Sequence, residues 1–136
     1  MGTDFFGIEV PFLDLLGVRA EQNEKGHVVI SLDLRPEHCN SLETAHGGVI
    51  MTLLDVAMAM AARTSVKHQG GAMTIDMSIA FLHPAKQRLI VEGRVLRGGR
   101  SLFFCEGEAR DASGVMVAKS LGTFKLHKAT AKEVRA

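Results

Sequence analysis

Residues 45–62 read Ala-His-Gly-Gly-Val-Ile-Met-Thr-Leu-Leu-Asp-Val-Ala-Met-Ala-Met-Ala-Ala. From Gly48 to about Val66, apolar side chains recur with the period of an α-helix and form two adjoining stripes. The stripes consist of Ile50, Leu53, Leu54, Ala57 and Ala61, and of Met51, Met58 and Ala62. A helix that is apolar nearly all round is buried on most of its sides. This stretch therefore predicts one long helix at the centre of the fold.

On both sides of this helix the pattern changes to the alternation that is typical of β-strands. Two runs that flank Gly26 can pair, and four long strands are predicted over residues 72–82, 88–97, 101–111 and 115–126. At the start of the chain, helical spacing predicts a short helix over residues 4–16, interrupted by Pro11. We therefore expect an α+β fold in which one antiparallel sheet of five to six strands wraps around the central helix.

Composition limits the classes of function. The chain has 136 residues, enough for one domain, and we expect that domain over residues 1–127, with a polar tail at 128–136. Its net charge of +1 lacks the basic excess of nucleic-acid-binding proteins, so we expect no nucleic-acid partner. The longest nearly uncharged run has 16 residues and contains Asp55, whereas a membrane span needs about 20. We therefore expect no membrane association.

Cysteine and histidine usage narrows the expectations further. Two cysteines are too few for a disulfide framework, and the N-terminus lacks the basic start of a secretory signal. These features predict a protein of a reducing compartment, the cytoplasm. The six histidines show no metal-ligand spacing, so we expect no metal site.

Two features of the central helix suggest chemistry. Asp55 and Thr52 are the only polar side chains between Gly47 and Ala62, and a buried carboxylate needs a partner. Gly47 and Gly48 offer bare backbone N–H groups at the positive end of the helix, where a carbonyl or oxyanion can bind. The alternative interpretations are an aspartate on a helix face that touches water and a tight loop-to-helix turn.

The spacing of these features constrains how they act. Gly47 and Asp55 are eight residues apart, which corresponds to about 12 Å along a helix and a rotation of about 80°. One small carbonyl group cannot touch both on the same helix. If they act together, Asp55 must come from a second copy of the chain, which predicts an isologous dimer with two shared sites.

Three stretches of the sequence form a recognisable set of motifs: Asn40-x5-His46-Gly47-Gly48-x6-Asp55, Thr74-Ile75-Asp76-Met77-Ser78 and Pro84-Ala85. Together they resemble the hotdog-fold thioesterases of the phenylacetate-degradation (PaaI) type, and the order of elements matches over about residues 10–127. The resemblance implies a hotdog fold and hydrolysis of acyl-coenzyme A, with aryl-acetyl, benzoyl-type or medium-chain acyl groups. It also implies a homodimer joined edge to edge, a homotetramer as a dimer of dimers, and no cofactor, since coenzyme A is part of the substrate.

The resemblance assigns roles to five residues. Gly47 would offer its N–H to the thioester carbonyl, and Asp55 of the other subunit would act as nucleophile or as general base on water. Asn40 would help to place substrate or water, and Thr74 would hold water or Asp55. His46 would shape the turn, although a purely structural role is equally open for it.

Further residues are expected to bind the substrate. A basic turn between the strands predicted at 88–97 and 101–111 would hold the coenzyme A phosphates. The start and one face of the central helix would line the acyl pocket. These residues are Arg97, Gly98, Gly99, Arg100 and Ser101 in the hairpin, and Gly48, Met51, Leu54 and Met58 in the helix. The alternatives are a solvated basic turn and plain core packing.

Two other functions are alternatives to the thioesterase. A non-catalytic acyl-coenzyme A binding module would need the glycine turn and a pocket, but neither Asp55 nor Thr74. A hotdog hydratase resembles a pattern in which a histidine follows the catalytic aspartate by a few residues, and residues 56–67 contain no histidine. The sequence therefore favours the thioesterase.

Overall fold

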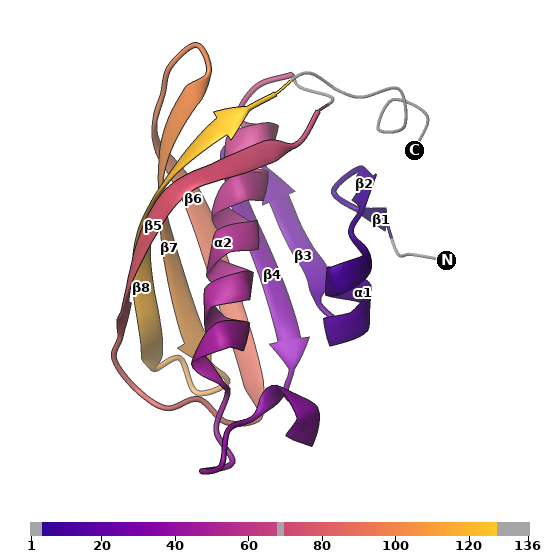
Figure 1. Ribbon diagram of the computed structural model, residues 1–136, viewed down its shortest axis with the longest axis vertical. Coiled ribbons are helices and arrows are strands. Elements are labelled where there is room, and N and C mark those ends of the chain that lie inside the picture. The colour runs from indigo at the N-terminus through magenta and orange to yellow at the C-terminus, as the bar shows by residue number, and fades with distance from the viewer. Residues whose placement is uncertain (1–3, 68–69, 128–136) are drawn as a thin grey trace.

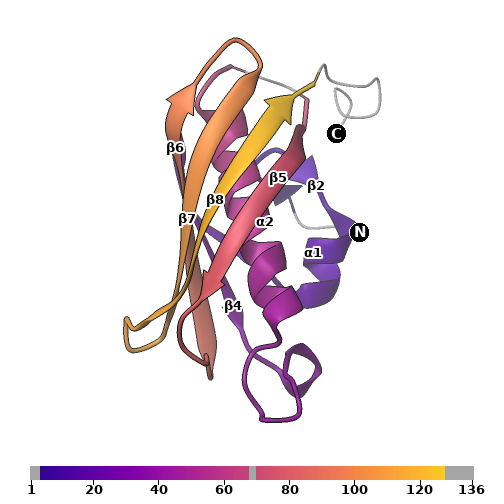
Figure 2. The same cartoon turned by 60° about the vertical axis from the view of Figure 1, so that its left-hand side comes forward.

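A computed structural model describes residues 4–67 and 70–127 of the chain. A long helix, α2 (Gly47–Thr64), lies in the hollow of one curved antiparallel sheet (Figures 1 and 2). The sheet has six strands in the order β3-β4-β6-β7-β8-β5, which confirms the predicted α+β architecture. The strands are β3 (Arg19–Glu24), β4 (His27–Asp33), β5 (Ala72–Phe81), β6 (Arg88–Gly98), β7 (Leu102–Asp111) and β8 (Met116–Leu126). The expected tail, residues 128–136, lies outside the described residues.

Three glycines allow α2 to lie close to the sheet. A Cβ atom at Gly93 of β6 would collide with the backbone of Ala57 in α2. One at Gly107 would lie 3.0 Å from Leu54, and one at Gly122 would lie 3.1 Å from Met58. Larger residues here would push the helix away from the strands, so these glycines set the depth at which α2 packs.

Helix α2 has the length and the mean hydropathy, 1.3, of a membrane span. However, 56% of its residues are buried inside the protein, because the sheet curves around it. Its apolar surface is therefore explained by the core of this fold.

Strand β5 forms one edge of the sheet and is mostly exposed. Its residues Met73, Ile75 and Phe81 are each 53% exposed, although they are large and apolar. The pairing of β5 with β8 shifts register between Thr74 and Asp76, so Ile75 forms a bulge. A long apolar edge strand is ready to pair with another strand.

The prediction of a helix over residues 4–16 is wrong in its first half. Residues 4–9 form a small hairpin of β1 (Asp4–Phe5) and β2 (Ile8–Glu9), and helix α1 spans only Pro11–Leu16. The turn places Phe6 at φ 52° and Gly7 at φ 90°, which a right-handed helix cannot accommodate. The Arg63 guanidinium donates hydrogen bonds to the carbonyls of Phe6 and Gly70, so a tertiary contact holds the hairpin.

Candidate active site

The first turn of α2 leaves one backbone donor free. The N–H of Gly48 donates to His46 Nδ1 at 2.9 Å, which makes His46 the N-terminal cap of the helix. The N–H groups of Val49 and Ile50 donate to the His46 carbonyl. Among the described residues, the N–H of Gly47 has no hydrogen-bond partner. This donor lies at the positive end of the helix dipole and suits an incoming carbonyl oxygen.

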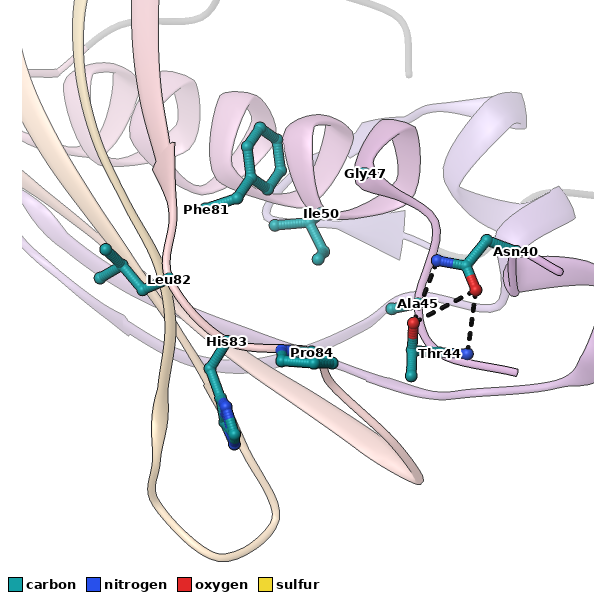
Figure 3. A pocket seen from close by; sticks show the side chains of 9 residues that line it. All are labelled: Asn40, Thr44, Ala45, Gly47, Ile50, Phe81, Leu82, His83 and Pro84. Atoms are coloured by element: carbon teal, nitrogen blue, oxygen red, sulfur yellow. Dashed lines mark hydrogen bonds between the residues drawn. The ribbon is translucent and has the colours of Figure 1, made fainter. Parts of the chain in front are cut away.

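Asn40 organises the loop that leads into α2. Its Oδ1 accepts hydrogen bonds from the backbone N–H of Leu42 and of Thr44, at 2.9 and 3.2 Å. Its Nδ2 donates to Thr44 Oγ1 at 3.0 Å (Figure 3). The amide that was expected to place substrate or water thus also shapes the loop beside the helix start.

A cavity of about 310 Å³ opens beside Gly47. Asn40 and Thr44 form a polar wall, and the Phe81 ring stands over the first turns of α2 on the apolar side (Figure 3). A Cβ atom at Gly47 would lie 3.6 Å from that ring, an ordinary contact distance. The complete lining is Asn40, Thr44, Ala45, Gly47, Ile50, Phe81, Leu82, His83 and Pro84.

Asp55 is held by a residue of the edge strand. The Thr74 hydroxyl donates to Asp55 Oδ1 at 2.6 Å, a short, charge-assisted hydrogen bond. Thr74 faces the helix because the bulge at Ile75 reverses the alternation of β5 at that point. In the part of the chain that the structure describes, Oδ2 has no hydrogen-bond partner. One carboxylate oxygen is thus fixed and the other is open to water or substrate.

Gly47 and Asp55 are not brought together within one chain. Both lie on the unbroken helix α2, so eight residues separate them by about 12 Å along its axis. Asp55 with Thr74, and the cavity beside Gly47, are therefore two separate places on one chain.

The other expected substrate residues lie in two places. Along α2, Met51 is 45% exposed, whereas Leu54 and Met58 are fully buried in the core. The β6–β7 hairpin, with Arg97, Gly98, Gly99, Arg100 and Ser101, is exposed at the top of Figure 1. Within a chain, Gly47 lies against Phe81 at the far end of β5 from this hairpin, whereas Thr74 lies at the hairpin's end.

Several residues of the cavity wall are not predicted from the sequence. Pro84 belongs to one of the motifs quoted above, but no pattern in the sequence connects Phe81 or His83 to Gly47. Thr44 follows Asn40 by four residues, a spacing that suits side-chain pairing within a tight loop, and is the one signal available from sequence. The position of Phe81 follows only from how β5 lies against α2.

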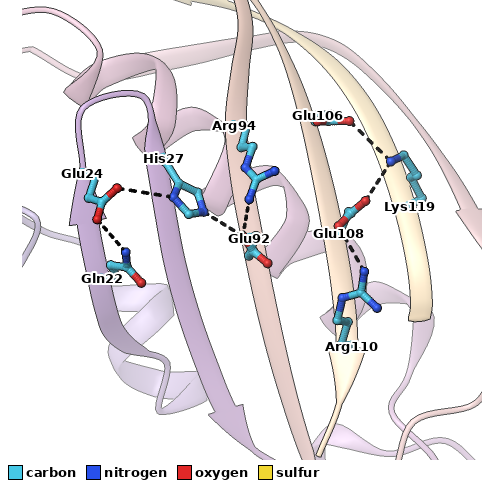
Figure 4. A network of polar contacts seen from close by, with 9 residues as sticks. All are labelled: Gln22, Glu24, His27, Glu92, Arg94, Glu106, Glu108, Arg110 and Lys119. Carbon is cyan, nitrogen blue, oxygen red and sulfur yellow. Dashed lines mark hydrogen bonds and ion pairs between the residues drawn. The ribbon is translucent and has the colours of Figure 1, made fainter. Parts of the chain in front are cut away.

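The outer face of the sheet carries a polar network across β3, β4, β6, β7 and β8 (Figure 4). Lys119 pairs with Glu106 and Glu108, at 3.4 and 2.8 Å, and its hydrogen bond holds the pKa of Glu108 below the usual range. Glu92 likewise lies 2.7 Å from the His27 ring and 3.1 Å from Arg94. Within residues 4–67 and 70–127, no group of three or more His, Cys, Asp or Glu residues is arranged to hold a metal ion.

Comparison with known proteins assigns the family. Residues 42–118, more than half of the chain, match the model of the thioesterase superfamily. Human acyl-coenzyme A thioesterase 13 is 30% identical over 101 residues, which cover 72% of this chain and 71% of the human protein.

Solved structures agree with this assignment. The PaaI protein from the phenylacetic acid degradation operon of E. coli superposes with a TM-score of 0.81 and 21% identity, over 89% of this chain and 87% of that one. Protein smu.793 of Streptococcus mutans, solved bound to acetyl CoA, has a TM-score of 0.74 and 26% identity, over 83% and 91%. The chain therefore belongs to the thioesterase superfamily, has its hotdog fold, and is a thioester hydrolase.

Proposed function

We propose that this protein hydrolyses acyl-coenzyme A to a free acid and coenzyme A, in sites shared between two copies of the chain. Each site would combine the Gly47 N–H of one subunit with Asp55 of the other. The observation that carries this proposal is the hydrogen bond from Thr74 to Asp55, because it holds a carboxylate beside an unpaired edge strand. Human acyl-coenzyme A thioesterase 13 and the acetyl-CoA complex of smu.793 support coenzyme A as the carrier.

The position of the two half-sites on β5 favours this pairing. Thr74 lies near the start of the strand and holds Asp55, while Phe81 ends the strand and lies against Gly47. Antiparallel pairing of β5 with its copy, about a two-fold axis at Ser78, would set Thr74 opposite the partner's Phe81, because Ile75 is bulged out of the pairing. Each Asp55 would then face the partner's helix start, which one chain alone cannot achieve.

The apolar character of the edge supports the same arrangement. Met73 and Ile75 are as exposed as Phe81, and pairing of the two edges would cover them. The dimer would also bring the β6–β7 hairpin of the subunit that supplies Asp55 to the end where the partner's Gly47 lies. Arg97 and Arg100 would there receive the coenzyme A phosphates.

The chemistry follows from these positions. The Gly47 N–H hydrogen-bonds the thioester carbonyl oxygen and stabilises the negative charge that develops on it. Asp55 attacks the carbonyl carbon, or removes a proton from the water that does so, and Thr74 holds its carboxylate in place. The carbon–sulfur bond breaks, coenzyme A leaves as a thiolate that takes up a proton, and water supplies the oxygen of the acid.

The substrates that we propose carry aryl-acetyl, benzoyl-type or medium-chain acyl groups. Met51 is the exposed helix residue with a flexible side chain to contact them. We place the protein in the cytoplasm, and its two cysteines, Cys39 and Cys105, are free thiols.

The test measures thiol release from a panel of acyl-coenzyme A substrates by the wild-type protein and by Asp55→Asn. We expect the variant to lose at least about 10²-fold in kcat while its affinity for coenzyme A is unchanged. Asp33→Asn is the matched control, since Asp33 is an exposed carboxylate of β4, far from β5 in the order of the sheet. An Asp55→Asn protein with near-full activity would refute the role of Asp55, and a wild-type protein that binds but does not hydrolyse any substrate would indicate the binding module.

A further inference from the structure

His38 is a buried histidine that the proposed reaction does not use. It ends the short 3-10 helix η1 (Pro36–His38), and only 2% of its surface is exposed. Its Nδ1 accepts a hydrogen bond from the backbone N–H of Arg35 at 2.9 Å, and its Nε2 lies 2.9 Å from the carbonyl oxygen of Leu16. These partners require a neutral ring with the proton on Nε2, since Nδ1 must accept and Nε2 must donate.

The backbone of the same residue reaches the active-site turn. The carbonyl of His38 accepts the N–H of His46 at 2.9 Å, and the next residue, Cys39, forms a β-bridge with Ala45. His46 in turn caps α2 through Gly48. His38 therefore connects the end of α1, helix η1 and the cap of the central helix through three hydrogen bonds.

We infer that His38 is a positioning residue, whose ring holds the loop of residues 39–46 so that the Gly47 N–H stays directed at the substrate carbonyl. This inference rests on the proposed role of Gly47. Without the imidazole nitrogens, the Arg35 N–H and the Leu16 carbonyl lose their hydrogen-bond partners in a buried place. They regain partners only if the backbone around residues 35–39 moves. A small movement of a backbone donor lowers the rate of catalysis, because the donor's stabilisation of the oxyanion depends on distance and direction.

The loop has few other anchors to the rest of the protein. The Ala45 N–H donates to the Ala85 carbonyl, and the remaining hydrogen bonds of Asn40 and Thr44 lie within the loop itself. Loss of the His38 ring nitrogens should therefore shift the N-terminal cap of α2. Asp55 and Thr74 should stay in place, because a hydrogen bond to each other holds them.

The experiment compares His38→Phe, which keeps a ring of similar size without polar atoms, with His38→Gln, whose amide can both accept and donate. Each variant is assayed at a temperature where circular dichroism shows it to be folded. We expect His38→Phe to lower kcat about tenfold with less than a twofold change in KM, and His38→Gln to recover part of the loss. His27→Phe is the matched control, because its ring is bonded to Glu92 on the outer face of the sheet.

Amide hydrogen exchange supplies a readout that does not depend on activity. In His38→Phe, the amides of His46 and Gly48 should exchange faster, whereas that of Thr74 should be unchanged. Wild-type kcat in folded His38→Phe, or unchanged exchange at His46 and Gly48, would overturn the inference. If His38→Phe fails to fold, the same two criteria apply to His38→Gln, with smaller changes expected. Failure of the proposed site itself would be recognised separately, by an active Asp55→Asn protein.

Discussion

The Thr74 hydroxyl donates a 2.6 Å hydrogen bond to Asp55 Oδ1, and so joins the edge strand β5 to the central helix α2. The bond ties one oxygen of the carboxylate and thereby sets the direction of the other. A catalytic carboxylate must be oriented as well as ionised, since small displacements of a reacting group reduce the rate. The edge strand thus positions the carboxylate that we propose to be catalytic and, in the proposed dimer, would also provide the surface for the second subunit.

Replacing Thr74 tests this orientation directly. Thr74→Val preserves the shape of the side chain but removes the donor, so we expect kcat to fall about tenfold. Thr74→Ser keeps the hydroxyl and should retain most of the activity. The measurement is thiol release at saturating substrate, and equal rates for Val and wild type would show that the hydrogen bond does not orient Asp55.

The facing of Thr74 also marks the limit of what the sequence predicts. The long helix followed from apolar residues all round it, and the four long strands followed from alternation; both are confirmed. Strict alternation through Phe81, Ile79 and Met77 would have turned Ile75 inward and Thr74 outward. The bulge depends on how β5 pairs with β8, a long-range interaction that periodicity within one segment does not report.

The N-terminal hairpin differs from the predicted helix for a related reason. The spacing of Phe5 and Ile8 suits a helix, but Phe6 adopts a positive φ that few non-glycine residues tolerate. The hydrogen bond from Arg63 to the Phe6 carbonyl comes from the far end of α2. Contacts between segments distant in sequence thus decide both the hairpin and the inward facing of Thr74.

Gly93→Ala tests how closely α2 packs against β6. The added Cβ would collide with the backbone of Ala57, which cannot move aside as a flexible side chain can. We expect a loss of about 3 kcal/mol in the free energy of unfolding, at the upper end of the range for overpacking. The melting temperature should fall by about 10 °C. Gly99→Ala, whose Cβ would meet only the Leu102 carbonyl at 3.3 Å, should cost much less, and equal losses would contradict the prediction.

The two cysteines should differ in reactivity. Burial raises the pKa of the Cys105 thiol to about 12, so almost none of it is thiolate at pH 8, whereas Cys39 is partly exposed. A disulfide reagent should modify one thiol per chain in the native protein and two after unfolding. Because folding raises this pKa, a pH above the ordinary thiol pKa ionises Cys105 in the unfolded chain before it does so in the folded one. The contribution of this thiol to the free energy of unfolding is therefore present below the ordinary thiol pKa and is lost as the pH rises toward 12. Rapid native modification of both thiols would contradict the burial of Cys105.

A charge on the edge strand should separate the subunits. Ile75→Arg places a cation in the surface that β5 pairing would bury, where an unpaired charge is costly. We expect a monomer by light scattering and the loss of most activity, since each site would lose half of its residues. Leu121→Arg is the control, because Leu121 is about as exposed as Ile75 but lies on the outer face of β8, between the buried Ser120 and Gly122. The same measurement on the wild type reports whether two dimers associate into a tetramer, and a fully active Ile75→Arg monomer would exclude the shared site.

Mixing two inactive variants tests the shared site most directly. Asp55→Asn chains lack the carboxylate, and Asn40→Ala chains are damaged in the loop beside Gly47. If each site takes Asp55 from one chain and the Gly47 cavity from its partner, a mixed dimer contains one intact site and one doubly damaged site. Random exchange makes about half of the dimers mixed, so activity should return to roughly a quarter of the wild-type level after the parental rates are subtracted.

The mixing experiment needs proof that subunits exchange, which mass spectrometry of differently tagged chains provides. Asp55→Asn mixed with Thr74→Val is the negative control, because both changes damage the same half-site. In that pair the mixed dimer has one damaged half in each of its two sites, so no activity should be regained. If exchange is confirmed and the Asn40→Ala mixture stays at the parental average, then Asp55 must act within its own chain. That outcome would require α2 to bend enough to close the 12 Å or so between Gly47 and Asp55, against the unbroken helix of the structure.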